Sequence, residues 1–308
     1  MTPALLFVLA AFAVPHTQAP ARTPVRGASA LEQAVTRLMT GFQGRVFVYA
    51  KNLDTGAEFA MAADDRVRTA STIKLPILCA LSARVAAGRM KWDDRITLHD
   101  ADKISGSGVL TELSDGTVLT LRDLSNLMIV VSDNTATNLV LDRLTADAVN
   151  DYLDTIGLRQ TRSNRKIRGD GTALKPAEGW SKAGSVEENG RFGIGVSTPR
   201  EMVRLLEMLE RGTVVSARVS NEIIATLKRQ QYKDGIGRHA GDIEVASKSG
   251  ALDHLRSDVG IAYAKGGRIA MAITVDDMPK IDYSPDNVGN LLIADIALAL
   301  IDGLAPVR

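Results

Sequence analysis

Ser71-Thr72-Ile73-Lys74 is the part of this sequence with the clearest potential for chemistry. A serine and a lysine three residues apart share one face of a helix. A serine hydroxyl becomes a useful nucleophile when an amine within hydrogen-bond reach takes its proton. The spacing alone is weak evidence, because Ser163 and Lys166 repeat it in the same chain. Ser71 is therefore a candidate nucleophile only if other groups support it.

Two further motifs, Ser132-Asp133-Asn134 and Lys248-Ser249-Gly250, follow in the chain and could complete an acyl-transfer site. Ser71 would attack a carbonyl, and Lys74 would accept its proton if burial beside Lys248 lowers the pKa of Lys74. Ser132 could pass a proton to the leaving nitrogen. The predicted catalytic residues are thus Ser71, Lys74 and Ser132.

The groups expected to bind the substrate share hydrogen-bonding or cationic character. Asn134 could hold a substrate amide, and Lys248 with Ser249 could bind a substrate carboxylate. Backbone N–H groups could form an oxyanion hole. The expected substrate-binding set is Asn134, Lys248, Ser249, Gly250, Ala251 and Arg256, with the N–H groups of Ser71 and Ala251 as the oxyanion hole and Arg256 as a further cation.

Composition narrows the classes of partner. The chain has 308 residues, 45% hydrophobic and 24% charged, and a formal net charge of +1, which gives no electrostatic case for nucleic acid or an anionic membrane. The four histidines (16, 99, 239, 254) lack metal-ligand spacing, so neither a metal nor another cofactor is expected. With Cys79 as its single cysteine, the chain cannot form an intramolecular disulfide. We expect a monomer that acts on a small-molecule or peptide substrate.

The N-terminus reads as a targeting segment. An apolar run over residues 4–14 is followed by Ala19-Pro20-Ala21, a small-x-small pattern typical of signal-peptide cleavage. This predicts a signal peptide over residues 1–21, a lead-in over 22–28, and a periplasmic or secreted protein. The run is too short to span a bilayer, so no stable membrane anchor is expected. A buried N-terminal helix is the alternative interpretation.

Residue periodicity predicts where the motifs lie. Strand-like hairpins near both ends of the chain can form one sheet only if the ends come together. We therefore predict an α/β (α+β) fold: an antiparallel sheet flanked by helices, from residues 29–70 and 213–308, and a helical lobe from 71–212. The expected strands are 44–51, 57–61, 244–249, 258–265 and 268–275, the last two joined by a turn at Gly266-Gly267. Residues 158–197 show no clear period and read as a long loop.

The three motifs, in this order, resemble those of the class A β-lactamase family of serine hydrolases, which is related to penicillin-binding proteins. The segments 68–71, 131–139 and 197–202 also look like family segments. The resemblance covers nearly the whole chain after the lead-in. It implies a β-lactamase/transpeptidase-like fold and opening of β-lactam rings through an acyl-enzyme at Ser71, an activity tied to antibiotic resistance. The roles given above for Lys74, Ser132, Asn134, Lys248 and Ser249 match those that the resemblance implies.

One departure from the family concerns its loop glutamate, which activates the water that frees the acyl-enzyme. By the resemblance, that position falls near Lys166 or Ile167, and neither is acidic. The glutamates of the loop are Glu178, Glu187 and Glu188, and Glu188-Asn189 is the nearest acid–amide pair. Sequence does not say whether any of them lies beside Ser71. The departure predicts that acylation survives while deacylation becomes slow.

Two alternatives remain open at this stage. A peptidase, transpeptidase or esterase of the penicillin-binding type would keep the same nucleophile and change the substrate, and the missing glutamate favours it relative to an ordinary β-lactamase. A non-catalytic β-lactam-binding protein would keep the fold alone. The intact Ser71, Lys74, Ser132 and Lys248 argue against that second alternative.

Overall fold

The computed structural model describes residues 28–169 and 178–306 of the chain. The predicted signal peptide (1–21) and nearly all of the predicted lead-in lie outside these ranges. Within them, no helix is both long enough and apolar enough to cross a membrane.

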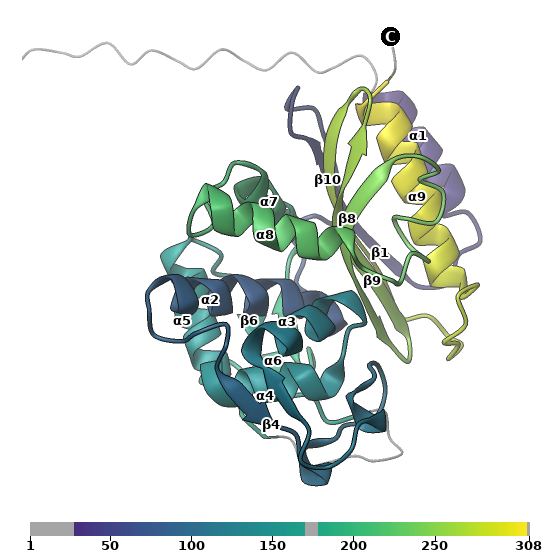
Figure 1. Ribbon diagram of the computed structural model, residues 1–308. Helices are drawn as coiled ribbons and strands as arrows, with labels where there is room; N and C mark the ends of the chain where they lie inside the picture. Colours follow the sequence, from purple (N-terminus) through teal and green to yellow (C-terminus); the bar gives the residue numbers. More distant parts are fainter. Residues whose placement is uncertain (1–27, 170–177, 307–308) are drawn as a thin grey trace, which may run out of the picture.

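A five-stranded antiparallel sheet forms one half of the molecule (Figure 1). Its strands lie in the order β2, β1, β10, β9, β8. Their bounds are β1 Arg45–Asn52, β2 Glu58–Met61, β8 Glu244–Leu252, β9 Leu255–Ala264 and β10 Gly267–Asp276. β1 pairs with β10 along its full length, so the prediction that both chain ends build one sheet is confirmed.

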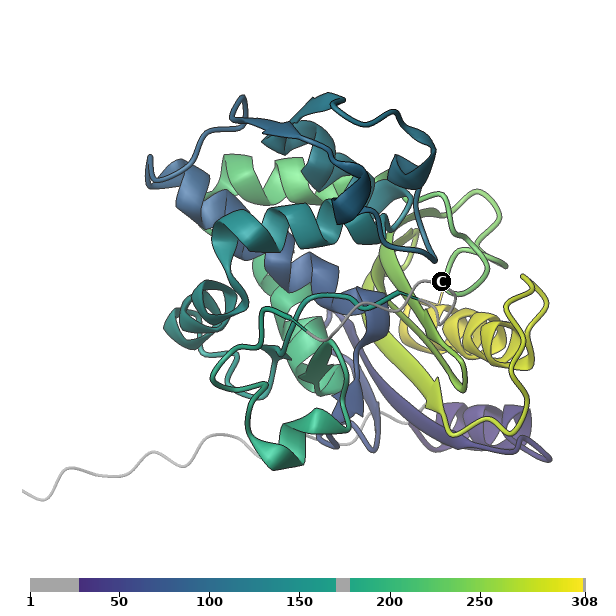
Figure 2. The same cartoon turned by 90° about the horizontal axis from the view of Figure 1, so that it is seen from below.

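Helices cover both faces of the sheet. On one face, α1 (Ala28–Leu38) packs beside α9 (Val288–Leu304), and α9 contacts β9 and β10 (Figure 2). On the other face, α7 (Pro199–Glu210) contacts β1 and β10, and α8 (Ala217–Lys228) contacts β8. The sheet is thus a central layer, as predicted.

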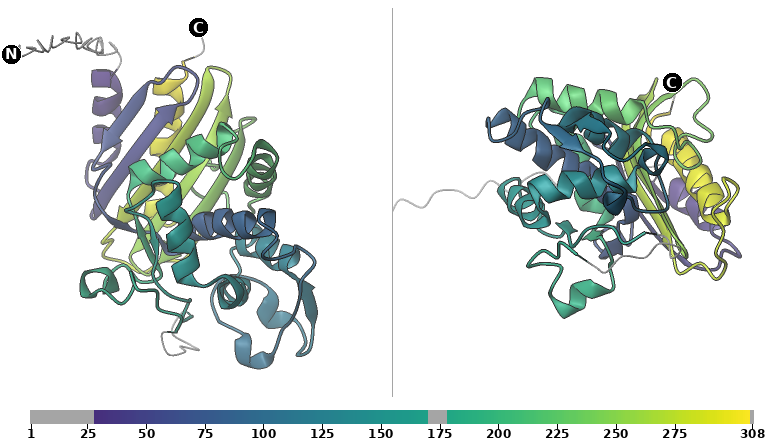
Figure 3. Two further views of the ribbon diagram at one scale, coloured as in Figure 1. Left: turned by 90° about the vertical axis from the view of Figure 1, so that its left-hand side faces the viewer. Right: turned by 60° about the horizontal axis from the view of Figure 1, so that its bottom comes forward.

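The middle of the chain adds a helical half next to α7 and α8 (Figure 3). It contains α2 (Lys74–Ala86), α3 (Leu121–Val130), α4 (Asn134–Leu144) and α5 (Ala146–Thr155). One cluster of buried side chains runs from these helices to the sheet and includes Leu81, Leu124, Leu206 and Ile261. This shared core fixes the helical half against the sheet.

The bounds of the last three strands differ from the predictions by a few residues. Gly267 pairs with Ala264, so the β9–β10 turn consists of Lys265 and Gly266 rather than Gly266 and Gly267. Gly267 instead begins β10, where it has φ +136° and where an added Cβ would lie 2.7 Å from the side chain of Asn52. β8 runs to Leu252 and turns at residues 253–254 into β9, which extends both strands beyond their predicted ends.

The described parts of the segment 158–197, residues 158–169 and 178–197, contain more regular structure than expected. They contain β6 (Arg162–Ser163), the short helix α6 (Glu187–Gly190) and β7 (Gly195–Ser197). β7 lies between β6 and β3 (Val67–Arg68) in a small second sheet. A hairpin of β4 (Arg95–Thr97) and β5 (Val118–Thr120), which the periodicity did not predict, lies in the helical half.

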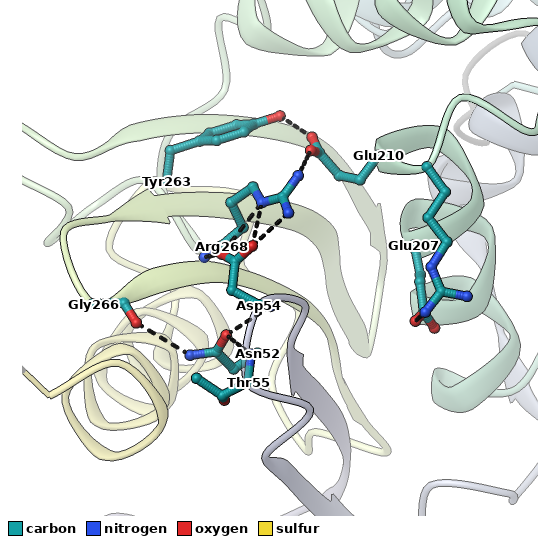
Figure 4. A network of polar contacts seen from close by, with 9 residues as sticks. Asn52, Asp54, Thr55, Glu207, Glu210, Tyr263, Gly266 and Arg268 are labelled. Carbon is teal, nitrogen blue, oxygen red and sulfur yellow. Dashed lines mark hydrogen bonds and ion pairs between the residues drawn. The ribbon is translucent and has the colours of Figure 1, made fainter.

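Charged side chains join two hairpin turns of the sheet to α7 (Figure 4). Arg268 donates to Asp54 Oδ1 at 2.5 Å and to Glu210 Oε2 at 2.8 Å. The Tyr263 hydroxyl donates to the other oxygen of Glu210 at 2.5 Å. These bonds fix the end of α7 against the sheet.

Candidate active site

Ser71 lies in a 3-10 turn that leads into α2, not in the first turn of the α-helix itself. The turn covers Ala70–Ile73, and α2 begins at Lys74. Ala70 has φ +46°, an unfavourable conformation for a residue with a Cβ. Such local strain persists only where the surroundings enforce it, and it is common at functional sites.

Lys74 lies fully buried behind this turn. Its Nζ donates to the Ser132 carbonyl at 2.7 Å, to Ser132 Oγ at 3.2 Å and to Asn134 Oδ1 at 3.0 Å. An ammonium has three donors, so these three acceptors account for all of them. The first motif is therefore tied directly to the second.

The second motif occupies the junction between α3 and α4. Ser132 has φ +54°, a second non-glycine residue in the left-handed region. The Asp133 carboxylate caps α4 by accepting from Ala136 N at 2.8 Å, and it also accepts from Val109 N and Leu110 N at 2.7 and 2.9 Å. Asp133 therefore holds the junction in place and has no free oxygen directed at a substrate.

Lys248, on β8, reaches the same serine from the opposite side. Its Nζ donates to Ser132 Oγ at 3.0 Å and to the Ser249 carbonyl at 2.7 Å. Burial lowers the pKa of Lys248 to about 7. Burial and then the charge of Lys248 hold the pKa of Lys74 well below its usual value. A buried lysine with a lowered pKa loses its proton more easily and can then accept one from a serine.

Gly250 is the point at which the sheet touches the turn that holds Ser71. A Cβ added to Gly250 would lie 2.9 Å from the Thr69 carbonyl oxygen and 3.0 Å from Ser71 N. A glycine here lets two backbones approach closely. The backbone N–H of Ser71 is thereby brought beside the strand that carries Ala251.

A cavity of about 770 Å³ opens over these motifs. Its wall includes most of the residues predicted from sequence, namely Ser71, Ser132, Asn134, Ser249, Gly250, Ala251 and Arg256. Lys74 and Lys248 are not part of that wall. Both are buried behind it and contact Ser132, which lies on the wall. The structure thus brings the three motifs together around one cavity.

Comparison with known proteins identifies the fold and the family. A family model described as the beta-lactamase enzyme family matches residues 30–304. The chain belongs to this β-lactamase family. A β-lactamase from Sphaerobacter thermophilus has a TM-score of 0.77 and 31% identity, over 91% of this chain and 98% of its own. Beta-lactamase 3 of Bacillus cereus is 27% identical over 88% of this chain and 80% of its own length.

Related penicillin-binding structures are similar as well. A variant of PBP-A has a TM-score of 0.73 and 25% identity, over 91% of this chain and 97% of its own. The predicted β-lactamase/transpeptidase-like fold is confirmed. The chain is a serine hydrolase of the β-lactamase type.

Arg256 sits in the cavity wall of this β-lactamase with much of its guanidinium already engaged. Its Nη1 donates to the carbonyls of Leu252 and Leu255 at 2.6 Å each, and its Nη2 donates to the Asp282 carbonyl. The Tyr283 ring lies 4.8 Å from the guanidinium carbon. Arg256 is fixed in position, and its charge remains close to the cavity.

Lys166 and Ile167, the two positions near which the resemblance places the family's glutamate, have different surroundings. Ile167 is on the wall of the cavity, and its backbone N–H and C=O bond the Asn138 side chain at 2.8 and 2.9 Å. The Lys166 side chain instead pairs with Asp142 at 2.7 Å and with Glu178 at 3.2 Å. An apolar side chain therefore occupies the clamped position beside the cavity.

The three loop glutamates do not line this cavity. Glu178 is paired with Lys166, and Glu187 and Glu188 are exposed on α6. The amide of Asn189 is engaged by Arg66 and by the Ala183 carbonyl. Among the described residues, the carboxylates on the cavity wall are Asp234 and Asp258, both from the sheet side.

Asp258 is a site residue that sequence reasoning missed. It lies on β9 opposite Ser249 and is 1% exposed. Its Oδ2 accepts from Ile236 N at 2.9 Å, whereas its Oδ1 has no partner in the described structure. Burial raises the pKa of Asp258 to about 7. The available signal was an aspartate directly before the strand-forming run 259–264, two residues after Arg256.

His254 does not line the active-site cavity. Its ring Nδ1 is 2.7 Å from the Met278 carbonyl oxygen. Across the described ranges, no group of three histidine, cysteine, aspartate or glutamate side chains is placed to hold a metal ion.

Proposed function

We propose that Ser71 is the residue acylated by β-lactams and that Lys74 is the base for this step. The single observation that carries the proposal is the position of Lys74 Nζ, which is buried, has a lowered pKa and contacts Ser132 in the adjoining motif. A neutral Lys74 takes the Ser71 proton as the hydroxyl attacks the lactam carbonyl. Ser132, bonded by both lysines, then delivers its proton to the lactam nitrogen as the ring C–N bond breaks, and it regains a proton from Lys74, which becomes neutral again.

The remaining roles follow from the charges and donors on the cavity wall and, for Lys248, from a buried ammonium group that contacts Ser132 on that wall. Lys248 and Ser249 bind the substrate carboxylate, and fixed Arg256 adds positive charge. Asn134 holds the substrate amide through its side chain. The backbone N–H groups of Ser71 and Ala251 stabilise the oxyanion, a type of contact that typically contributes about 10²–10³ in rate per donor.

Release of the acyl group is the slow step in this proposal. A water that attacks the ester needs a general base, which typically contributes about 10²–10⁴ in rate. Ile167, one of the two positions near which the resemblance places the family's glutamate, lines the cavity and has no proton acceptor in its side chain. The protein therefore captures β-lactams faster than it frees them.

Intact-mass spectrometry combined with hydrolysis of benzylpenicillin tests both halves of the proposal. We expect a long-lived adduct with the mass of the whole antibiotic, because ring opening expels no leaving group. Ser71→Ala should abolish the adduct. Rapid turnover without an adduct would overturn slow release, and labelling of Ser71→Ala would overturn the assignment of the nucleophile.

A second candidate function is hydrolysis or transfer of peptidoglycan-like acyl groups. The observation that favours it is the apolar Ile167 beside the cavity. An isoleucine side chain cannot activate water, which suits an enzyme that does not hydrolyse its acyl-enzyme rapidly. One similar structure is that of a PBP-A variant, recorded as an acyl-enzyme complex with penicillin G. Release of D-alanine from a D-Ala-D-Ala peptide, measured beside hydrolysis of a chromogenic cephalosporin, separates the two functions.

The location of the protein is also a proposal. We infer export from the apolar run and the small-residue site before residue 22. N-terminal sequencing of the protein from a periplasmic or culture fraction should give Arg22 as the first residue. Recovery of the uncleaved chain in the cytoplasm would contradict this inference.

A further inference from the structure

A second cavity, of about 540 Å³, lies outside the active site. It is formed by the start of β1, the end of β10, β3 and the segment after α6. Its charged and aromatic lining consists of Arg45, Phe47, Arg66, Arg68, Arg191, Phe192, His254, Asp276 and Asp277. It shares no lining residue with the active-site cavity. Its volume falls within the range of small-molecule sites, roughly 300–1,000 Å³.

The lining carries more positive charge than its own carboxylates neutralise. Arg45 pairs with Asp277 at 2.7 Å, and Arg68 pairs with Asp276 through two nitrogens. Arg66 and Arg191 have no carboxylate partner in the described part of the chain. Two guanidinium charges are thus uncompensated at one cavity, in a protein whose formal net charge is +1.

Phe192 fixes both of these arginines. Its ring is 3% exposed, and the guanidinium carbons of Arg66 and Arg191 lie 4.8 and 4.6 Å from the ring centroid. Arg66 also donates to the Asn189 side chain. A guanidinium over a ring keeps its N–H donors at its edge, where they can bond oxygen atoms. Both guanidinium carbons therefore lie within 5 Å of one ring centroid, although the two charges repel each other.

A dianionic oxyanion is the chemical group that best fits this arrangement. Guanidinium edges match phosphate oxygens in pairs, and two uncompensated positive charges balance a phosphate monoester. The cavity is larger than a bare ion, and the nearly buried Phe47 and Phe192, 4% and 3% exposed, form the aromatic wall of its lining. We propose that this cavity binds a small organic phosphate, with the phosphate held by Arg66 and Arg191 and the organic part against the aromatic wall.

Calorimetric titration of the full chain with phenyl phosphate tests the proposal. We expect saturable binding that weakens as sodium chloride is raised, because exposed charges are screened. Arg66→Gln and Arg191→Gln should each raise the Kd by about tenfold, as the loss of a charge-assisted bond predicts. Arg218→Gln is the matched control: it removes the same charge from an 83% exposed side chain on α8 and should leave the Kd unchanged.

Absence of binding at about 10 mM phenyl phosphate, a binding free energy weaker than about 3 kcal/mol, would overturn the proposal. The proposal would also be wrong if the Arg66→Gln/Arg191→Gln double variant bound phenyl phosphate as tightly as the wild type. Binding of neutral benzyl alcohol with the same Kd as phenyl phosphate would contradict it as well. Penicillin labelling of the double variant verifies that it is folded. Inorganic phosphate, titrated in parallel, should bind more weakly because it cannot use the aromatic wall.

Discussion

Lys74 and Lys248, two fully buried lysines, donate to the same oxygen, Ser132 Oγ, at 3.2 and 3.0 Å. Two ammonium groups this close in a buried site disfavour each other's protonated form. The structure therefore couples the proposed base, Lys74, to Lys248, the cation proposed to bind the substrate carboxylate. A single serine hydroxyl joins the two roles.

Replacement of Lys74 by methionine should lower the rate of acylation by about 10²–10⁴, the range typical of a general base. Lys74→Arg should be equally impaired, because a guanidinium does not give up its proton. Stopped-flow labelling with a fluorescent penicillin measures the rate. Lys166→Met, in the repeated Ser-x-x-Lys motif, is the control and should label normally. If Lys74→Met labels at the wild-type rate, Lys74 is not the base.

Introduction of a carboxylate at Ile167 should restore turnover. Ile167→Glu places an acid on the cavity wall at a position that Asn138 holds by two backbone bonds. We expect the lifetime of the penicillin adduct to fall by about 10² or more. Lys166→Glu is the matched control: its side chain faces Asp142 and Glu178, so it should gain no turnover. An unchanged adduct lifetime in Ile167→Glu would place the slow step elsewhere.

A methyl group at Gly250 should separate the sheet from the nucleophile. In Gly250→Ala the new Cβ would lie 3.0 Å or less from Ser71 N and the Thr69 carbonyl, so β8 must shift. Acylation should slow by about tenfold or more, because an oxyanion donor acts only when it is correctly placed. Gly190→Ala, where nothing lies within 4 Å of the added Cβ, should retain wild-type labelling. Equal labelling rates in both variants would remove Gly250 from the positioning of Ser71.

The pH dependence of acylation should be bell-shaped. The acid limb arises because Lys74 must lose its proton, and the alkaline limb because Lys248 must keep its own, with a pKa of about 7. An ionised Asp258 raises the pKa of Lys248. Asp258→Asn removes that charge, so the alkaline limb should move to lower pH.

Second-order acylation rates between pH 5 and 9 check this prediction. Asp234→Asn, at the other aspartate on the cavity wall, is the control and should leave the alkaline limb in place. If the alkaline limb of Asp258→Asn falls at the same pH as that of the wild type, Asp258 does not raise the pKa of Lys248.

The sequence was sufficient to predict the sheet and the three motifs because both depend on local patterns. Alternating strand residues and adjacent polar triplets can be recognised within four to ten residues. The elements that it missed are short or depend on partners far along the chain. β7 is three residues long and is stabilised by pairing with Val67–Arg68, more than a hundred positions earlier. Sequence alone could not predict the proposed role of Asp258, because Asp258 and Lys248 come close to each other only when β9 pairs with β8.

The strand order also determines when the active site can exist during synthesis. β1 is made early, but its partner β10 ends at Asp276, near the end of the chain. A chain that stops before Gly267 leaves β1 with β2 as its sole strand neighbour and leaves β9 without β10. Ser71 and Lys248 are thus held together only after the chain has been made as far as β10. Folding of this enzyme must then wait for long-range pairing, which is slow compared with the formation of its helices.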